Sequence, residues 1–332
     1  MKKRMLLSIF VALVLVGTVF AGGAQEASQG PMTLKIGYGV PATSVAGKYV
    51  QKWADAVTEE TNGRLKFEIY PSGQLGSLVE MLEACDLNTL DITFNDASLM
   101  LTYVPEIALL SQPMLIKDYE HMDKVVQGEV GQELARRVDE QTNMHVLGWV
   151  RNGFRNIISK RPLNSLEDCK GFIIRSPESD IYIDTFTLLG MAPTPIPYSE
   201  IYTALQTGVV EGAETSFEQF ILASFYELAT YVLESNHMAA SMSLIINKDT
   251  WNSIPEGDRK IMEDLYAEIF ARCNEEVAAA EQGFKQQLKD LGCTFSQFED
   301  QDEIVNIFMN YWSKFAKKNN CEDLLQEVIA LR

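Results

Sequence analysis

The stretch that decides the fold runs from Gly171 to Phe220 and reads GFIIRSPESDIYIDTFTLLGMAPTPIPYSEIYTALQTGVVEGAETSFEQF. It predicts two short buried strands, 172–174 and 209–213, joined by two helices. Arg175 directly follows the first strand, and Thr215 comes just after the second. In an open α/β sheet, ligands bind outside the carboxyl ends of the strands. We therefore expect Arg175 and Thr215 to face a ligand from neighbouring strand ends.

An arginine in this position favours a carboxylate as the ligand. Its guanidinium offers two parallel N–H groups that match the two oxygens of a carboxylate, whereas lysine offers only a point charge. Ser176 and Pro177 follow Arg175 and limit the freedom of the backbone. The alternative, a structural ion pair within the protein, stays open from the sequence alone.

The length and the periodicity of the chain predict two α/β lobes. At 332 residues the chain is too long for one ordinary core. Alternating strand patterns at 34–38, 65–70 and 90–94 are separated by helical patterns, which predicts a βαβαβ opening with a parallel sheet. A strand at 145–150 ends this sheet, and a strand at 241–247 is placed to return to it. We expect the lobes to be interleaved.

A long helix is predicted over Glu256–Leu291, where apolar residues recur at spacings of three and four. The apolar positions are Ile261, Leu265, Ile269, Cys273, Val277, Phe284, Leu288 and Leu291. A helix of this length spans ~54 Å, more than one lobe, and can brace both. Two helices broken near Gly283 are the alternative, because a glycine inside a helix is unfavourable.

These expectations define the domain organisation. Lobe I comprises residues 32–152 plus 241–280, and lobe II comprises residues 153–240 plus 281–332. Two strand patterns, 231–233 and 241–247, are expected on either side of a turn at Asn236-His237. The expected fold class is thus a two-lobe α/β fold with interleaved lobes, a ligand cleft between them and a long helix that spans both.

The N-terminus predicts export. Three basic residues at 2–4 precede an apolar run at 5–20, and small residues flank a cleavage position after Ala21. An uncleaved anchor is the alternative, but the run is shorter than the ~20 residues that a spanning helix needs. Residues 1–21 are therefore expected to be a signal peptide and residues 22–31 a flexible tether, with no insertion in the membrane after cleavage.

The charge of the chain excludes some partners. The formal net charge is −18, and loss of the three basic residues leaves 25 positive against 46 negative side chains, or −21. Such a chain is not attracted to nucleic acid or to anionic membranes. An acidic chain that binds an anion needs locally placed positive charges, so an arginine near a strand end is stronger evidence of an anion site here. Arg155, two residues after Gly153, is a second candidate for an anion site.

Cysteine and histidine usage offers no sign of a cofactor, a metal site or catalysis. The five cysteines have neither CxxC nor zinc spacing, and we expect no disulfide framework. The pairs Cys273–Cys293 and Cys293–Cys321 stay open. The three histidines lie in no catalytic motif. An enzyme is therefore not expected; the alternative of an exported enzyme would use His237, on an expected strand-end loop, as its base.

The chain resembles a solute-binding protein of a tripartite ATP-independent periplasmic (TRAP) transporter, of the DctP type. The resemblance covers the chain in order beyond the export signal. The matching segments are QLGS (74–77), RNGFRNI (151–157), PLNSLEDCKGFIIR (162–175), MAPTPIPYSEIYTALQTGVVEGAET (191–215) and NHMAASMSLIINKDTW (236–251).

The resemblance implies a periplasmic binding protein with no catalytic role. It implies an organic acid whose carboxylate pairs with Arg175, helped by Arg155, with Tyr198 packed on the ligand. The residue after GAE is usually an asparagine that binds the ligand, and here it is Thr215. The implied partners are the small and large membrane subunits of a TRAP permease. A role in sensing rather than transport is an alternative with the same site.

Thr215 is the departure that bears on the ligand. A hydroxyl and a methyl replace an amide that both donates and accepts hydrogen bonds. Phe217 and Phe220 follow, and Met242 lies where some sugar-acid-binding relatives carry a polar residue. These residues predict a monocarboxylate with a partly apolar body, such as a keto, hydroxy or aromatic acid. A uronate or a dicarboxylate stays open as the alternative.

Overall fold

The computed structural model describes residues 30–332. The chain divides into two units, Met1–Met32 and Thr33–Arg332, and the fold belongs to the second. The predicted signal peptide with its cleavage site, and residues 22–29 of the predicted tether, lie outside the described residues. Among the described residues, no helix combines the length and the apolar character that crossing a membrane requires.

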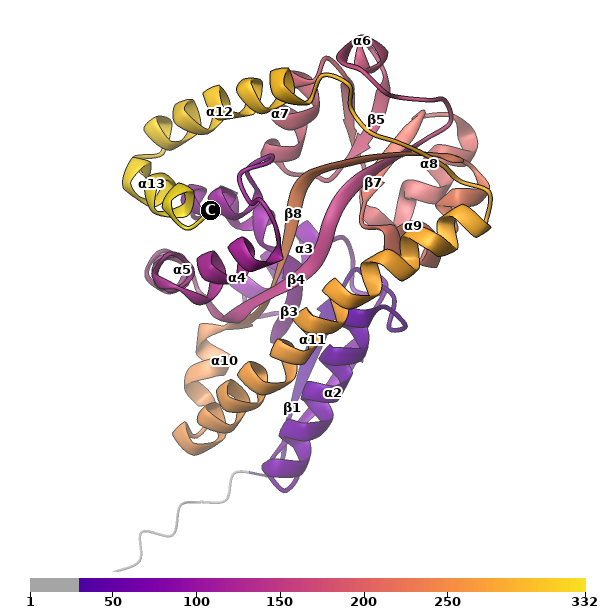
Figure 1. Cartoon of the computed structure of the whole chain (residues 1–332). Helices are drawn as coiled ribbons and strands as arrows, with labels where there is room; N and C mark the ends of the chain where they lie inside the picture. The colour runs from indigo at the N-terminus through magenta and orange to yellow at the C-terminus, as the bar shows by residue number, and fades with distance from the viewer. Residues whose placement is uncertain (1–29) are drawn as a thin grey trace, which may run out of the picture. The chain divides into compact units, whose positions relative to one another are not determined.

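One mixed sheet runs through this unit in the order β2-β1-β3-β8-β4-β7-β5-β6, with β9 paired to β8. The strands are β1 (Met32–Tyr38), β2 (Leu65–Tyr70), β3 (Ile92–Asp96), β4 (Met144–Ser159), β5 (Ile173–Ser176), β6 (Ala192–Pro195), β7 (Gly212–Thr215), β8 (Tyr231–Asn247) and β9 (Thr294–Ser296). Strands β1 and β3 pair in parallel, as do β5 with β6 and with β7. The long antiparallel pair β4 and β8 joins these two parallel groups (Figure 1).

The two long strands correct one prediction and confirm another. The expected separate strands at 231–233 and 241–247 belong to one strand of 17 residues, β8, but an interruption between them, around Asn236-His237, is present: the pairing of β8 with β4 shifts register between Leu233 and Met238, and Asn236 has φ +42°. These polar residues resemble a turn in the sequence, yet their backbone groups find partners within the fold: the Asn236 N–H donates to Asn156 Oδ1 at 3.0 Å, and the His237 carbonyl accepts from the Met114 N–H at 2.9 Å. The predicted return to the first sheet is confirmed, because β8 pairs with β3.

Strand β4 carries a bulge that positions side chains for the site. Its register with β8 shifts between Arg151 and Phe154, so that one extra residue is accommodated at Asn152-Gly153. Gly153 has φ +83°, and a Cβ there would lie 3.2 Å from the Cβ of Ser216. Glycine is therefore required at this position, and the bulge changes the direction of the Asn152 side chain.

Helices cover the sheet, and the longest is α11 (Glu256–Asp290), which lies against α2 and crosses β4 (Figure 1). The other α-helices are α2 (Val45–Glu60), α3 (Leu78–Asp86), α4 (Tyr119–Gln127), α5 (Glu129–Gln141), α6 (Leu166–Cys169), α7 (Asp180–Leu188), α8 (Ile201–Thr207), α9 (Phe217–Leu222), α10 (Lys248–Ser253), α12 (Gln301–Lys318) and α13 (Glu322–Ala330). Short 3-10 helices include η1 (Ala97–Thr102), η2 (Pro105–Ser111), η3 (Tyr198–Glu200) and η4 (Phe225–Glu227).

The prediction of one continuous long helix is confirmed, since α11 passes through Gly283 without a break. Cys273 and Leu288 of the predicted apolar face are buried, but the buried face differs from the predicted one in the first part of the helix. Met262, Tyr266 and Phe270 are buried, whereas the preceding residues Ile261, Leu265 and Ile269 are only partly buried. Both rows are apolar, so the sequence pattern alone does not choose between them.

All five cysteines are buried and unpaired. Neither of the two disulfides that the sequence left open is present. Burial raises the pKa of the Cys273 thiol to about 12 and that of Cys169 to about 12. These side chains therefore act as small hydrophobic residues of the core.

Candidate functional site

A cavity at the carboxyl ends of β5 and β7 brings together most of the predicted site residues. We call it the arginine cavity. It has an empty volume of about 490 Å³, which includes the part open to solvent. Its lining residues are Gly39, Val40, Leu78, Asp96, Asn152, Arg155, Arg175, Pro177, Tyr198, Thr215, Gln219 and Met242. They come from both parallel groups of strands, from the long strands between them, and from the helices α3, η3 and α9 with adjoining loops.

Arg175 lies in β5, one residue before the end of the strand, and its side chain is buried. Its Nε donates to the Ile196 carbonyl at 2.8 Å, and its Nη1 lies 3.3 Å from Glu214 Oε1. Within the described part of the chain, Nη2 has no hydrogen-bond partner. Burial lowers the pKa of Arg175 to about 10, against the opposing charge of Glu214. The group remains charged at neutral pH and holds an unused donor at the cavity.

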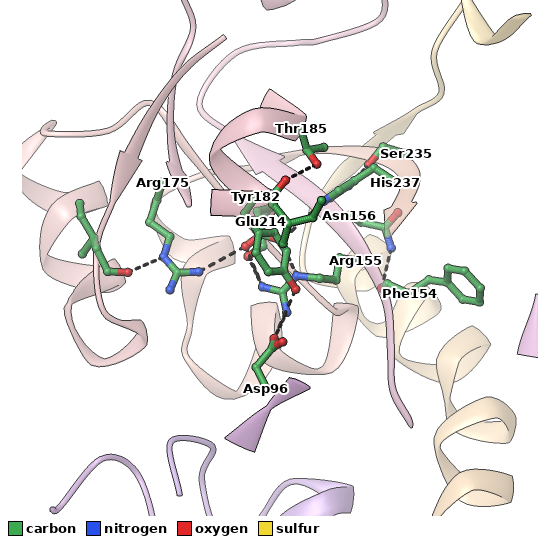
Figure 2. A network of polar contacts seen from close by, with 12 residues as sticks. Asp96, Phe154, Arg155, Asn156, Arg175, Tyr182, Thr185, Glu214, Ser235 and His237 are labelled. Atoms are coloured by element: carbon green, nitrogen blue, oxygen red, sulfur yellow. Dashed lines mark hydrogen bonds and ion pairs between the residues drawn. The ribbon is translucent and has the colours of Figure 1, made fainter. Parts of the chain in front are cut away.

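Arg155 and Glu214 form a buried ion pair behind Arg175. Both nitrogens Nε and Nη2 of Arg155 donate to the two carboxylate oxygens of Glu214, the second at 2.7 Å. Figure 2 shows the guanidinium groups of Arg155 and Arg175 both directed at this carboxylate. Burial by itself would raise the pKa of Glu214, but the charge and hydrogen bonds of Arg155 outweigh it and lower the pKa to about 2. Glu214 thus stays ionised and holds both arginines in place.

The lowered pKa of Glu214 predicts a pH dependence of stability. Since the folded pKa of about 2 lies below the ordinary 4.5, the contribution of Glu214 is complete above pH 4.5. It is lost as the pH falls through about 2. We expect the difference in unfolding free energy between wild type and Glu214→Gln to shrink over this window, measured by urea denaturation at several pH values. A difference that stays constant from pH 5 to 2 would contradict the assigned ionisation of Glu214.

Three further side chains surround the ion pair (Figure 2). Asp96, the last residue of β3, lies with Oδ2 3.9 Å from Arg155 Nη1 and accepts a hydrogen bond from the Tyr182 hydroxyl at 3.3 Å. The ring of Tyr182 lies under the Arg155 guanidinium, 4.9 Å away. His237 Nε2 is 3.6 Å from Glu214 Oε2, and burial lowers the pKa of this histidine.

Tyr198 forms another wall of the arginine cavity and is held from behind. Its hydroxyl donates to Gln219 Oε1 at 2.6 Å, and Gln219 Nε2 donates to Glu218 Oε2 at 3.3 Å. The other oxygen of Glu218 accepts the backbone N–H of Val45, the first residue of α2, at 2.7 Å. A chain of hydrogen bonds therefore connects the cavity wall to the N-terminus of α2, where a carboxylate is favourable.

The structure separates the predicted site residues into two groups. Arg175, Arg155, Thr215, Tyr198 and Met242 line the arginine cavity. The expected placement of Arg175 and Thr215 is confirmed, because β5 and β7 are parallel neighbours that end on the same side. Their binding roles stay predictions.

Phe217 and Phe220 do not line the arginine cavity. Their rings lie 6.4 Å apart in the core, and Phe217 also packs against Phe295 at 5.7 Å. Phe217 instead lines a different cavity, together with Tyr119. Both residues follow the strand end in α9, where helical geometry turns their side chains inward to the apolar core beneath the helix.

Three polar residues of the cavity are not among the predicted site residues: Asp96, Asn152 and Gln219. Asp96 ends a strand, so the rule applied to Arg175 and Thr215 could also have found it. The direction of Asn152 depends on the bulge, and that of Gln219 on the packing of α9. No local pattern marks either of them.

Comparisons with known proteins identify the family. Residues 36–319 match the family described as bacterial extracellular solute-binding protein, family 7, DctP. The chain belongs to this DctP family. A relative in the family is the sialic acid-binding periplasmic protein SiaP of Vibrio cholerae, 32% identical over 237 residues, which is 71% of this chain and 74% of SiaP.

Solved structures of TRAP periplasmic solute-binding proteins share the fold of this DctP-family chain. The protein from Desulfovibrio salexigens with bound orotic acid has a TM-score of 0.85 and 25% identity, covering 90% of this chain and 98% of its own. The protein from Xanthobacter autotrophicus with bound β-D-galacturonate has a TM-score of 0.86 and 25% identity, covering 90% and 100%. The predicted two-lobe α/β fold and the predicted TRAP resemblance are both confirmed.

Proposed function

We propose that this protein captures an organic acid anion in the arginine cavity and delivers it to a TRAP-type permease with a small and a large membrane subunit. The observation that carries the proposal is Arg175: a buried, charged guanidinium with one unpaired nitrogen at the cavity. A buried charge is costly unless it is paired. A ligand carboxylate supplies the missing partner, and Arg155 adds a second positive charge nearby.

We propose a monocarboxylate with a partly apolar body as the ligand. Two observations support this class. Val40, Leu78, Pro177 and Met242 contribute apolar side chains to the cavity wall. The ligands named for the relatives above, sialic acid, orotic acid and galacturonate, each carry a single carboxylate, which supports the monocarboxylate and not the apolar body. Thr215 offers this ligand one hydroxyl.

Capture requires that the ligand stabilise the closed arrangement of the lobes. In the proposed division, lobe I holds residues 32–152 plus 241–280, and lobe II holds residues 153–240 plus 281–332. The hydrogen bond from Val45 to Glu218 then joins lobe I to lobe II, and it continues through Gln219 to the wall at Tyr198. A ligand shifts the equilibrium only by its higher affinity for the closed form. A permease that recognises this form receives only loaded protein.

The proposed location is the periplasm, after cleavage of the signal peptide following Ala21. An exported enzyme is the less favoured function. Its expected base, His237, lies within β8 with a fully buried side chain and is absent from the residues that line the arginine cavity. A sensing role would use the same site with a receptor in place of the permease, and uptake by the permease reconstituted with this protein distinguishes the two.

A thermal-shift screen over organic acids tests the proposal. A ligand at 100 times its Kd adds ~2.7 kcal/mol to the free energy of unfolding, which raises the melting temperature of a chain of this length by about 4 °C. We expect this shift from a monocarboxylate and none from its methyl ester, which lacks the charge. Equal shifts from acid and ester would overturn the role of the carboxylate. A hexuronate released from the purified protein and identified by mass spectrometry would instead overturn the partly apolar body.

A further inference from the structure

Asp96 places a negative charge in the cavity that is proposed to bind an anion. It ends β3, which lies on one side of the long strands β8 and β4 in the sheet order, whereas Arg175 in β5 lies on the other side. Its side chain is buried, with 8% of it exposed. Asp96 and Arg175 both line the arginine cavity, so a ligand that reaches from Arg175 across it meets this carboxylate.

The carboxylate of Asp96 keeps unused capacity to accept hydrogen bonds. Its Oδ1 accepts the Ser98 N–H at 2.9 Å and thereby caps η1. Its Oδ2 accepts only the long bond from the Tyr182 hydroxyl at 3.3 Å, and the Arg155 nitrogen at 3.9 Å lies beyond hydrogen-bond distance. An ionised carboxylate has about four acceptor positions. Acceptor positions therefore remain for a ligand.

Within the network of Arg155, Arg175, Glu214 and Asp96, the charges balance before a ligand enters. Arg155 and Arg175 contribute two positive charges, and Glu214 and Asp96 contribute two negative charges. A monocarboxylate satisfies the free donor of Arg175 and leaves one excess negative charge. A dicarboxylate would leave two, with its second carboxylate close to Asp96 in a setting of low dielectric, where like charges repel strongly.

We propose that Asp96 selects acids that carry a hydrogen-bond donor, a hydroxyl or an ammonium group, at the end distant from the carboxylate, and that it rejects dicarboxylates. This inference rests on the proposed function, because it assumes that Arg175 holds the ligand carboxylate. It goes further by assigning a specificity-determining role to a residue of the opposite wall. The donor on the ligand completes the bonding of Oδ2.

Calorimetry with matched acids tests this assignment. The probes are butanoate, 4-hydroxybutanoate, 4-aminobutanoate and succinate, which share a four-carbon chain and differ in the group at the end distant from the carboxylate. The corresponding acids with chains of three, five and six carbons are measured in the same way. They are titrated into wild type and into Asp96→Asn, whose amide oxygen still caps η1. Asp264→Asn, an exposed aspartate of α11, is the matched control.

In wild type, we expect the hydroxy or amino acid to bind about tenfold or more tightly than the unsubstituted acid and than the dicarboxylate of the same length. In Asp96→Asn, the preference for the hydroxy or amino acid over the dicarboxylate should fall about tenfold, while the affinity for the unsubstituted acid stays constant. Asp264→Asn should retain the wild-type ratios.

The contradicting results distinguish a failure of the role of Asp96 from a failure of the proposed function. Suppose that the unsubstituted acids bind wild type, but that Asp96→Asn leaves every ratio of affinities unchanged or weakens the binding of all four kinds of acid equally. The role of Asp96 is then overturned, and the proposed function stands. If the dicarboxylates bind wild type best, the role of Asp96 is also overturned. If no acid of any length or end group binds, the proposed monocarboxylate ligand fails, and the role of Asp96 fails with it.

Discussion

Replacing Arg175 by alanine is expected to weaken binding of the ligand by roughly 30-fold or more, since loss of one partner of a buried charge pair costs ~2–5 kcal/mol. The measurement is isothermal calorimetry with the acid that stabilises wild type most in the thermal-shift screen. Arg175→Lys keeps the charge but loses the planar fork and the bond to the Ile196 carbonyl. We expect the affinity of Arg175→Lys for the ligand to lie between that of Arg175→Ala and that of wild type.

The stability of the ligand-free Arg175→Ala protein provides a second readout. Because burial lowers the pKa of Arg175 to about 10, the folded protein without ligand disfavours the charged form of this side chain relative to its neutral form. Alanine removes this cost together with the contacts to Ile196 and Glu214, so the unfolding free energy should fall by less than in Glu214→Gln. Arg272→Ala, an exposed arginine of α11 paired with Glu268, is the control and should leave binding intact. Wild-type affinity in Arg175→Ala would show that the carboxylate is held elsewhere.

The variant Glu214→Gln is expected to lower the free energy of unfolding by ~3–5 kcal/mol at neutral pH, the cost of breaking a buried ion pair by removing one partner. Glutamine keeps the shape of the side chain but leaves the charge of Arg155 uncompensated at a position with 5% exposure. Urea denaturation measures the change as a shift in the midpoint at constant slope.

Glu268→Gln is the matched control for this variant. Glu268 also pairs with an arginine, Arg272, but both side chains are exposed. Its loss should change the free energy of unfolding by no more than about 0.5 kcal/mol. Equal effects of the two substitutions would mean that the buried pair is dispensable for the fold, and that Glu214 does not organise the arginines of the cavity.

The positions of Arg175 and Thr215 could be predicted because they follow from local patterns. Each residue comes at or just after the end of a short apolar run, and the order of strands and helices requires the runs to be parallel. The predicted parallel character of the opening sheet, the continuous helix α11 and the return of the chain at 241–247 are confirmed for the same reason. They depend on periodicity and on chain order.

The partners of the buried charges could not be predicted in this way. Arg155 and Glu214 are 59 residues apart, and they meet only because β4 and β7 are neighbours in the sheet. His237 looked like a residue of a turn, because nothing nearby in the sequence accounts for a buried histidine. Phe217 and Phe220 looked like cavity residues, because the sequence does not indicate which face of α9 meets the core.

The long helix α11 shows the same contrast between local sequence patterns and tertiary contacts. Its apolar rows predicted a helix, but tertiary packing chose which row is buried. Trp53 of α2 donates to the Met262 carbonyl at 3.1 Å, and Tyr266 packs so closely on Gly148 that a Cβ there would lie 2.2 Å from its ring. These contacts come from segments more than a hundred residues away, and from Met262 to Phe270 they shift the buried face by one residue.

The sequence by itself determined the family, the order of the elements and the arginine at the end of β5, since all of these are local. Only the tertiary structure decided which charges meet at Glu214, which side chains share the cavity, and that Asp96 faces the proposed anion site from the opposite wall. The physical reason is the short range of the contacts. Periodicity encodes which face of a segment is buried, whereas a hydrogen bond or an ion pair depends on where two distant segments come within a few ångströms.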